Sequence, residues 1–288
     1  MEDSLLETKK IWDNLVAEGK VPFEKESFET RTLDPEDGRL PFLLVLNEGR
    51  SRYLRNLSKA PQENLCSFCS EETLDFKIIG LRSMRVIPYE YPCLPYQFIF
   101  ASKDHLIEIK REFIRDMIIF SQQTGLKLYY HKPKDSSLLT IHFHIRAALA
   151  SDTNFLEWVT AEPIISNSNV LIEKLNHTVY GLRLSGNKDK IAAIIYSIFR
   201  ADEYPISLVF WTDYVYLFPR SEKLIPTDFG EWLFGALEVI GTFICRDRET
   251  FQTLTYARLA EAMVDVSLHD KKRQKKIELQ LKTFLERD

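Results

Sequence analysis

TIHFHIR, residues 140–146, is the most informative stretch of this sequence. Alternate side chains of a β-strand share one face, so His142, His144 and Arg146 would line one side. The three apolar residues between them would enter the core. Three polar, cation-capable side chains in a row are costly to bury without a partner. Because a phosphate group or a metal ion would be such a partner, the stretch predicts a reactive strand.

Three interpretations of this strand follow from the residues alone. A histidine held by its neighbours can act as a nucleophile and split a displacement at phosphorus into two easier steps, and His144 is the candidate. A surface strand with incidental histidines is the second interpretation. The third is an HxH metal site, completed by a distant carboxylate, of the kind that oxygenases use. The pattern leaves all three open.

The elements around this stretch are expected in the same order twice. Strand, helix, strand and strand are predicted at 96–102, 103–124, 126–131 and 138–147. A second set is predicted at 180–184, 189–200, 206–211 and 214–218. This is a weak internal repeat in element order. Outside it, we expect a short strand at 40–46 and amphipathic helices at 5–18 and 270–288.

Size and composition limit the class of protein. The chain has 288 residues, of which 45% are hydrophobic and 12% aromatic, so it can build a core without disulfides. A formal charge of −4 argues against a general nucleic-acid binder. No stretch reaches the roughly 18 apolar residues of a membrane span, and the N-terminus lacks a signal-peptide pattern. We therefore expect a soluble cytoplasmic protein with no nucleic-acid or membrane partner.

Cysteine spacing indicates a second chemical feature. Cys66 and Cys69 form a CxxC, and two thiolates at this spacing suit tetrahedral zinc if two more ligands exist. No second CxxC is present, so His105 and His142 are the candidates. A redox CxxC is the alternative, although no thioredoxin-like context surrounds the pair. The remaining cysteines, Cys93 and Cys245, are expected to be plain buried thiols.

The proline-rich run YEYPCLP, residues 89–95, cannot form a regular helix. Its rigid, aromatic-lined backbone would make a wall for a flat ring such as a nucleotide base. An ordinary edge loop is the alternative interpretation.

Taken together, these motifs resemble the histidine triad (HIT-like) superfamily, in its long-chain branch. That branch contains galactose-1-phosphate uridylyltransferase, the diadenosine tetraphosphate phosphorylases and the GDP-hexose phosphorylases. NLCSFC (64–69) is similar to the zinc cysteine pair, FASKDH (100–105) to the strand end with a zinc histidine, and 140–146 to the catalytic strand. TRTL (30–33) and VYLFPR (215–220) are most similar to the GDP-hexose phosphorylases.

The resemblance implies a fold and a set of roles. It implies an α+β fold, an antiparallel sheet with helices, in which a catalytic half (1–175) and a C-terminal half (176–288) form a pseudo-dimer. His144 would be the nucleophile that forms a nucleotidyl-histidine, with Arg146 beside it. The only cofactor implied is structural zinc, which would be held by Cys66, Cys69, His105 and His142. The phosphate would contact Ser136, Ser137 and Arg220. The base and ribose would contact Tyr89, Tyr91 and Pro92.

The implied activity is transfer of a nucleotidyl group from a nucleotide sugar or dinucleoside polyphosphate to inorganic phosphate or a phosphorylated acceptor. The family usually has Gln or His at the position of Arg146, which leaves alternatives open. One is a non-catalytic, zinc-stabilised protein that binds nucleotides. Another is a nucleotide hydrolase with water as the acceptor. The protein would be a monomer or a homodimer, and neither the base nor the leaving group can be predicted.

Overall fold

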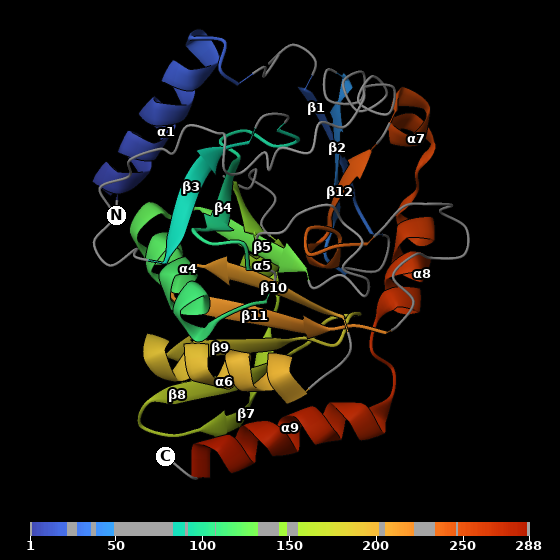
Figure 1. Cartoon of the computed structure of the whole chain (residues 1–288). Coiled ribbons are helices and arrows are strands. Elements are labelled where there is room, and N and C mark those ends of the chain that lie inside the picture. Colours follow the sequence, from blue (N-terminus) through green and yellow to red (C-terminus); the bar gives the residue numbers. More distant parts are fainter. Residues whose placement is uncertain are drawn as a thin grey trace.

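A computed structural model of the chain describes residues 2–21, 28–35, 39–48, 83–89, 92–106, 108–131, 144–148, 155–201, 205–221, 234–245 and 247–286. Within these ranges, nine strands form one large sheet in which every pair of neighbours is antiparallel (Figure 1). Their order across the sheet is β3 (Met84–Pro88), β4 (Phe98–Ser102), β6 (His144–Ala148), β5 (Lys127–His131), β10 (Ile206–Trp211), β11 (Tyr214–Pro219), β9 (Leu182–Gly186), β8 (Val170–Leu175) and β7 (Ala161–Ser166).

A second, small sheet joins strands that are far apart in the sequence. Its strands are β1 (Phe28–Leu33), β2 (Phe42–Asn47) and β12 (Thr242–Cys245). β2 is antiparallel to β1 but parallel to β12, and it is buried along its whole length. A parallel central strand of this kind carries a continuous apolar run, as FLLVLN does, because both of its faces are covered.

The described helices are α1 (Glu2–Ala17), α4 (Arg111–Thr124), α5 (Phe155–Trp158), α6 (Lys188–Ala201), η3 (Glu238–Ile240), α7 (Arg248–Thr253), α8 (Tyr256–Val266) and α9 (Lys271–Glu286). Across the described part of the chain, none of them is both long enough and apolar enough to pass through a membrane.

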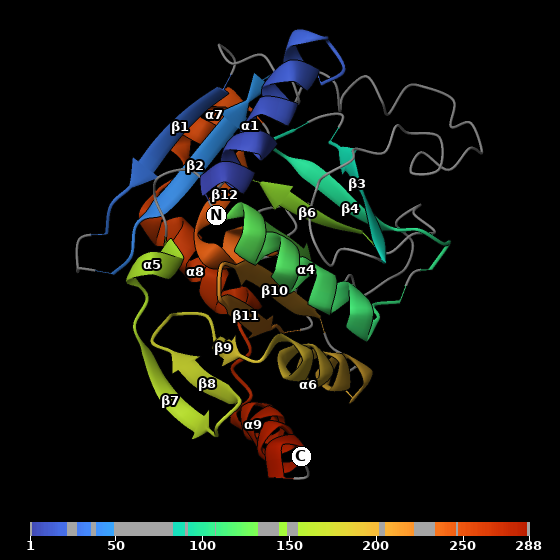
Figure 2. The same ribbon diagram turned by 90° about the vertical axis from the view of Figure 1, so that its left-hand side faces the viewer.

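The two faces of the large sheet are covered differently (Figure 2). On what we call the helix side, residues such as Ile145, Leu208 and Leu217 pack against α1, α4, α6 and α9. On the small-sheet side, Tyr129, Val209 and Tyr216 pack against the small sheet and α8. Because strand neighbours point to opposite faces, each strand contributes to both cores. Full burial of one large aliphatic side chain contributes about 1.5–3 kcal/mol.

The expected order of elements is found twice. The first set is β4, α4, β5 and β6, and the second is β9, α6, β10 and β11. The strand order β4-β6-β5 is followed by β10-β11-β9, which is the same order reversed across the β5–β10 pair. The expected division of the chain at residue 175 falls between β8 and β9, which are paired neighbours in this sheet.

One helix begins later than its sequence predicts. The apolar spacing predicts a helix from about Lys103, but α4 begins at Arg111. The Ser102 hydroxyl donates to the carbonyl oxygens of Asp104 at 2.7 Å and Leu106 at 3.3 Å, so it competes with helical hydrogen bonding. Lys110 is still extended, with φ −114° and ψ 156°. The predicted end is correct, because Gly125 adopts φ 71° and its N–H donates to the carbonyl of Ser121.

Candidate functional site

Strand β6 carries the centre of the predicted site. His144 is its first residue and pairs with Ala101 of β4, while Arg146 pairs with Ile99 of β4 and Tyr129 of β5. Ile145 is 1% exposed in the helix-side core, as the alternation predicts. Positions 144 and 146 therefore belong to the small-sheet side. The side chain of His144 lies outside the described residues, and so does the whole of His142.

Arg146 lies half-buried against an aromatic ring. Its guanidinium carbon is 5.1 Å from the ring centroid of Tyr89, which directly follows β3. Burial alone would lower the pKa of Arg146, but the nearby groups of Tyr89, Tyr129, Cys93 and Glu238 outweigh it and raise the pKa. Arg146 is thus a fixed cation on this face, although the family pattern has a residue that is neutral or titratable there.

Gln97 fixes the wall beside Arg146. Its side-chain oxygen accepts from the N–H groups of Cys93 at 2.7 Å and Leu94 at 3.3 Å, and its amide nitrogen donates to the Tyr129 hydroxyl. The carbonyl of buried Pro92 accepts from the Asn47 amide at 3.0 Å, which ties the wall to β2. The proline-rich run is therefore anchored to both sheets. Tyr91 lies outside the described residues.

Arg220, which follows β11, is the largest fully buried side chain described, with 0% exposure. Its backbone N–H donates to the Pro205 carbonyl at 2.9 Å, and its Nη1 contacts the Ser207 hydroxyl at 3.5 Å. Among the described residues, its Nε and Nη2 have no hydrogen-bond partner. Burial lowers its pKa to about 10, so it remains a cation at neutral pH. Since buried polar groups are normally paired, these nitrogens lack an acceptor that an oxyanion would supply.

The strand register brings Arg220 towards His144. Ser207 pairs with His131 of β5. It is two residues before Val209 in the same strand, so its side chain also lies on the small-sheet side. Continuing the β5–β6 register from Tyr129–Arg146 by two residues places position 131 opposite position 144. Ser207 is thus two strands from position 144, or about 10 Å. The guanidinium that touches Ser207 therefore lies on the same face as the predicted nucleophile.

A buried carboxyl group, that of Glu238, lies near both Arg146 and Arg220, and we call these three residues the arginine cluster. Glu238, in η3, is 7% exposed, and its Oε2 accepts from the Gly235 N–H at 2.7 Å. Burial raises the pKa of Glu238, while the backbone N–H groups and the guanidinium groups of Arg220 and Arg146 act to lower it. No motif marks Glu238 or Ser207 in the sequence, because only the fold brings them beside the arginines.

Several predicted residues lie outside the described part of the chain. They are Cys66, Cys69, His142, Ser136 and Ser137. His105 is exposed in the segment after β4. In the described ranges, no group of three or more His, Cys, Asp or Glu residues could hold a metal ion, so the zinc site stays a prediction. Cys93 and Cys245 are buried free thiols, as expected, and burial raises the pKa of Cys245 to about 12.

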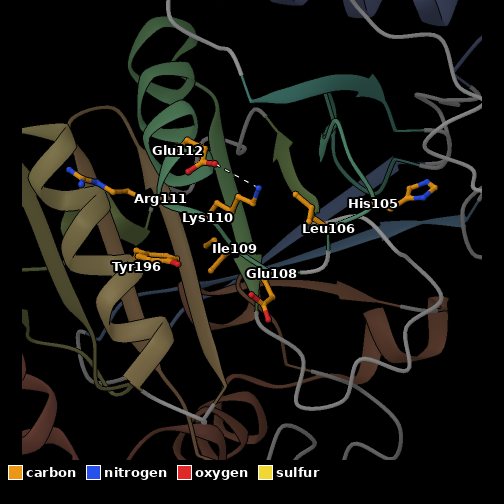
Figure 3. Close-up of a pocket in the computed structure, with 8 residues that line it drawn as sticks. All are labelled: His105, Leu106, Glu108, Ile109, Lys110, Arg111, Glu112 and Tyr196. Atoms are coloured by element: carbon orange, nitrogen blue, oxygen red, sulfur yellow. Dashed lines mark ion pairs between the residues drawn. The ribbon is translucent and has the colours of Figure 1, made fainter.

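A cavity of about 550 Å³ lies near His105, at the start of α4 (Figure 3). Its lining includes Lys110, Arg111 and Glu112 beside Tyr196 of α6. Figure 3 shows His105 at one end, apart from Tyr196 at the other. The Lys110 and Glu112 side chains are 4.0 Å apart, so its charges are mixed. Helices α4 and α6 cover the helix side, so this cavity is separate from the arginine cluster.

The fold matches solved structures over nearly the whole chain. Yeast Ap4A phosphorylase in complex with Ap4A superposes with a TM-score of 0.65 at 10% sequence identity, covering 92% of this chain and 97% of that one. The same enzyme in complex with AMP gives 0.59 at 11% identity, covering 94% and 98%. No family model matches the chain, and a search of curated proteins finds no significant match. The chain therefore has the fold of yeast Ap4A phosphorylase, as the resemblance implied.

Proposed function

We propose that this chain transfers a nucleotidyl group from a nucleotide sugar or a dinucleoside polyphosphate to inorganic phosphate or a phosphorylated acceptor. One observation carries the proposal most directly. A fully buried guanidinium, that of Arg220, has two nitrogens without a partner among the described residues, on the sheet face that also carries positions 144 and 146. A phosphate group, like a carboxylate, is an acceptor that such a planar donor set fits.

The proposed reaction has two displacements. A ring nitrogen of neutral His144 attacks the α-phosphorus, a P–N bond forms, and the P–O bond to the leaving phosphate breaks. An oxygen of the acceptor phosphate then attacks the same phosphorus, a new P–O bond forms, and the P–N bond breaks. His144 returns to its neutral form. Arg146 and Arg220 would stabilise the charge on the phosphorus oxygens in both steps, with Ser136 and Ser137 as further donors.

The base and ribose would lie against the proline-rich wall, at Tyr89, Tyr91 and Pro92. Two features support this position: the wall is anchored through Gln97 and Asn47, and the Tyr89 ring already holds the Arg146 guanidinium at 5.1 Å. A rigid wall loses little conformational entropy when a flat ring binds. The identity of the base is part of what the experiment below determines.

We also propose that the two strand–helix–strand–strand sets form a pseudo-dimer within one chain. The mirrored strand order around the β5–β10 pair, with α4 packed beside α6, supports this arrangement. In it, the N-terminal half supplies His144 and Arg146, and the C-terminal half supplies Arg220. One chain would then build the whole site, which suits either a monomer or a homodimer.

Zinc is the proposed structural cofactor, held by Cys66, Cys69, His105 and His142. A closed site of two thiolates and two imidazoles would stabilise the fold without an open position for water. β4 ends at Ser102 beside the start of β6 at His144, and this is the end of the strand pair where the proposal puts the metal. Elemental analysis of the purified protein should find one zinc per chain, and C66S/C69S should lose it.

The direct test is a search for the covalent intermediate. The protein is incubated with Ap4A, ADP-glucose or GDP-glucose, without and with inorganic phosphate, and examined by intact-protein mass spectrometry. We expect an acid-labile nucleotidyl adduct that phosphate discharges. H144A should form no adduct and show no turnover, while H269Q, which alters an exposed histidine, should behave like the wild type. Near-normal turnover by H144A would refute the mechanism.

The same experiment separates the two other functions. A hydrolase would release the nucleoside monophosphate at the same rate with or without inorganic phosphate. A non-catalytic nucleotide-binding protein would bind the nucleotides without any adduct. Arg146 favours this second alternative over the hydrolase, because its guanidinium, which lies over the Tyr89 ring, puts a permanent cation where the family pattern has a Gln or His.

A further inference from the structure

The backbone around Arg220 is held from the C-terminal part of the chain. Arg220 forms an isolated antiparallel bridge with Ser267, and the Ser221 N–H donates to the Val266 carbonyl at 3.1 Å. Ser267 is 1% exposed, and its hydroxyl accepts from the Tyr180 N–H at 3.0 Å. Figure 1 shows the chain leaving α8, passing the end of β11 and entering α9. Residues 220 and 221 are therefore fixed by the segment that joins α8 to α9.

Arg273, in the first turn of α9, also binds the backbone of Arg220. It is 9% exposed, and its Nη1 donates to the Arg220 carbonyl oxygen at 3.0 Å. Asp270 fixes that turn, because its carboxylate accepts from the N–H of Lys272 at 2.9 Å. A cation in the first turn opposes the helix dipole, and burial of a guanidinium adds a further cost. The contact with Arg220 is a gain that offsets these costs.

Both backbone groups of Arg220 are thus engaged. Its N–H donates to Pro205 at 2.9 Å, and its carbonyl accepts from Arg273 at 3.0 Å. The backbone fixes the position of Cα and limits the allowed side-chain rotamers, so these two bonds hold the base from which the unpaired Nε and Nη2 extend. Loss of the second bond would let the backbone turn, and a displacement of 1 Å is enough to misplace a ligand contact.

We propose that Arg273 is a positioning residue for the anion site, and that it acts through the Arg220 carbonyl without touching the ligand. This inference rests on the proposed function, because it assumes that Arg220 binds a phosphate group. It assigns to α9 a role in ligand affinity in addition to its apolar packing through Ile277 and Leu281.

The test is calorimetric titration with inorganic phosphate and with AMP, on the wild type and on R273M, R273K, Y180F and R220M. R273M should bind both ligands about tenfold more weakly, the effect of one ligand hydrogen bond that is lost when the Arg220 guanidinium is misplaced. R273K, which keeps a cationic donor, should recover most of that affinity. Y180F removes the bond of 3.2 Å from the Tyr180 hydroxyl to Glu278, so it loosens α9 without touching residue 220 and should bind normally.

The outcomes separate this inference from the proposed function. If R220M loses binding while R273M binds like the wild type, the role of Arg273 is wrong and the anion site stands. If R220M also binds normally, or the wild type binds neither ligand, the anion site itself is wrong. Should R273M fail to fold, hydrogen exchange on the wild type decides: phosphate should protect the amides of residues 266–274, and unchanged exchange there would overturn the inference.

Discussion

Two arginines on the small-sheet side of the large sheet show how differently one residue type can be used. Arg183 of β9 donates from Nε and Nη2 to both carboxylate oxygens of Glu173, at 2.7 and 2.9 Å. Its guanidinium carbon is also 4.9 Å from the ring centroid of Tyr214. Arg220 is more deeply buried, yet two of its nitrogens have no partner among the described residues. The two buried arginines therefore differ in pairing, and our proposal that Arg220 binds an anion rests on that difference.

The pKa shifts of the two arginines run in opposite directions, because Arg183 is hydrogen-bonded to a carboxylate and desolvation dominates at Arg220. The hydrogen bonds and the charge of Glu173 raise the pKa of Arg183 above its ordinary value. Desolvation lowers that of Arg220 to about 10, and Glu238 offsets only part of this. A paired charge stabilises its surroundings, while an unpaired one is a cost that a bound anion can remove. The comparison predicts different consequences when each arginine is removed.

The largest loss of stability is expected for R183M. Removal of Arg183 leaves Glu173, which is 7% exposed, as a buried carboxylate without its bidentate partner. We expect about 3 kcal/mol of destabilisation, measured by urea unfolding, because broken buried pairs cost 3–5 kcal/mol and this pair is slightly exposed. R115Q, which removes an exposed pair with Asp189, should cost only about 0.5 kcal/mol or less. Equal losses in the two variants would contradict the burial of the Arg183 pair.

A smaller effect is expected from the turn that joins Glu173 to Arg183. In it, Nδ1 of His177 accepts from the Val179 N–H at 3.0 Å, and burial lowers the pKa of His177 to about 4. The folded state therefore binds fewer protons than the unfolded state between pH 6.5 and about 4. Stability is then highest above pH 6.5 and falls as the pH drops through this window.

His177 should account for up to about 2 kcal/mol of that fall, with allowance for its partial exposure. H177N keeps an acceptor for the Val179 N–H but cannot titrate. Denaturant unfolding at several pH values should show a flatter profile for H177N than for the wild type. Parallel profiles would mean that His177 has the same pKa in the folded and unfolded states, which would contradict the burial of a neutral imidazole in this turn.

The paired elements near these arginines were predictable from local patterns, but the long-range contacts were not. β10, β11 and α6 appear within a residue or two of their predicted bounds, because each has a clear period and a turn or cap beside it. The parallel pairing of β2 with β12 joins Leu44 to Phe243, and no local pattern predicts a partner so distant in sequence. β7 and β8 were not predicted, and the apolar spacing before α4 was overridden by Ser102.

The candidate site shows the same division. The alternation at 140–146 correctly placed Ile145 in the core and Arg146 on the opposite face. The resemblance suggested Arg220, but the sequence could not show that its guanidinium is buried and unpaired. Glu238 and Arg273 could not be identified at all. Glu238 lies near the guanidinium groups of Arg146 and Arg220, and Arg273 donates to the Arg220 carbonyl. In both cases the partner belongs to another element, a relation that only the folded chain contains.

The smallest effect on stability, and the sharpest contrast, is expected for R220M. Methionine fills much of the same volume without leaving buried donors unpaired, and Glu238 can take up a proton where burial already raises its pKa. We expect a change of at most about 1 kcal/mol in urea unfolding, in either direction. The variant should nevertheless lose the shift in unfolding midpoint that AMP gives the wild type. R183M should keep that shift in spite of its larger loss of stability. A result in which R220M is the less stable variant and still binds AMP would reverse the roles of the two arginines.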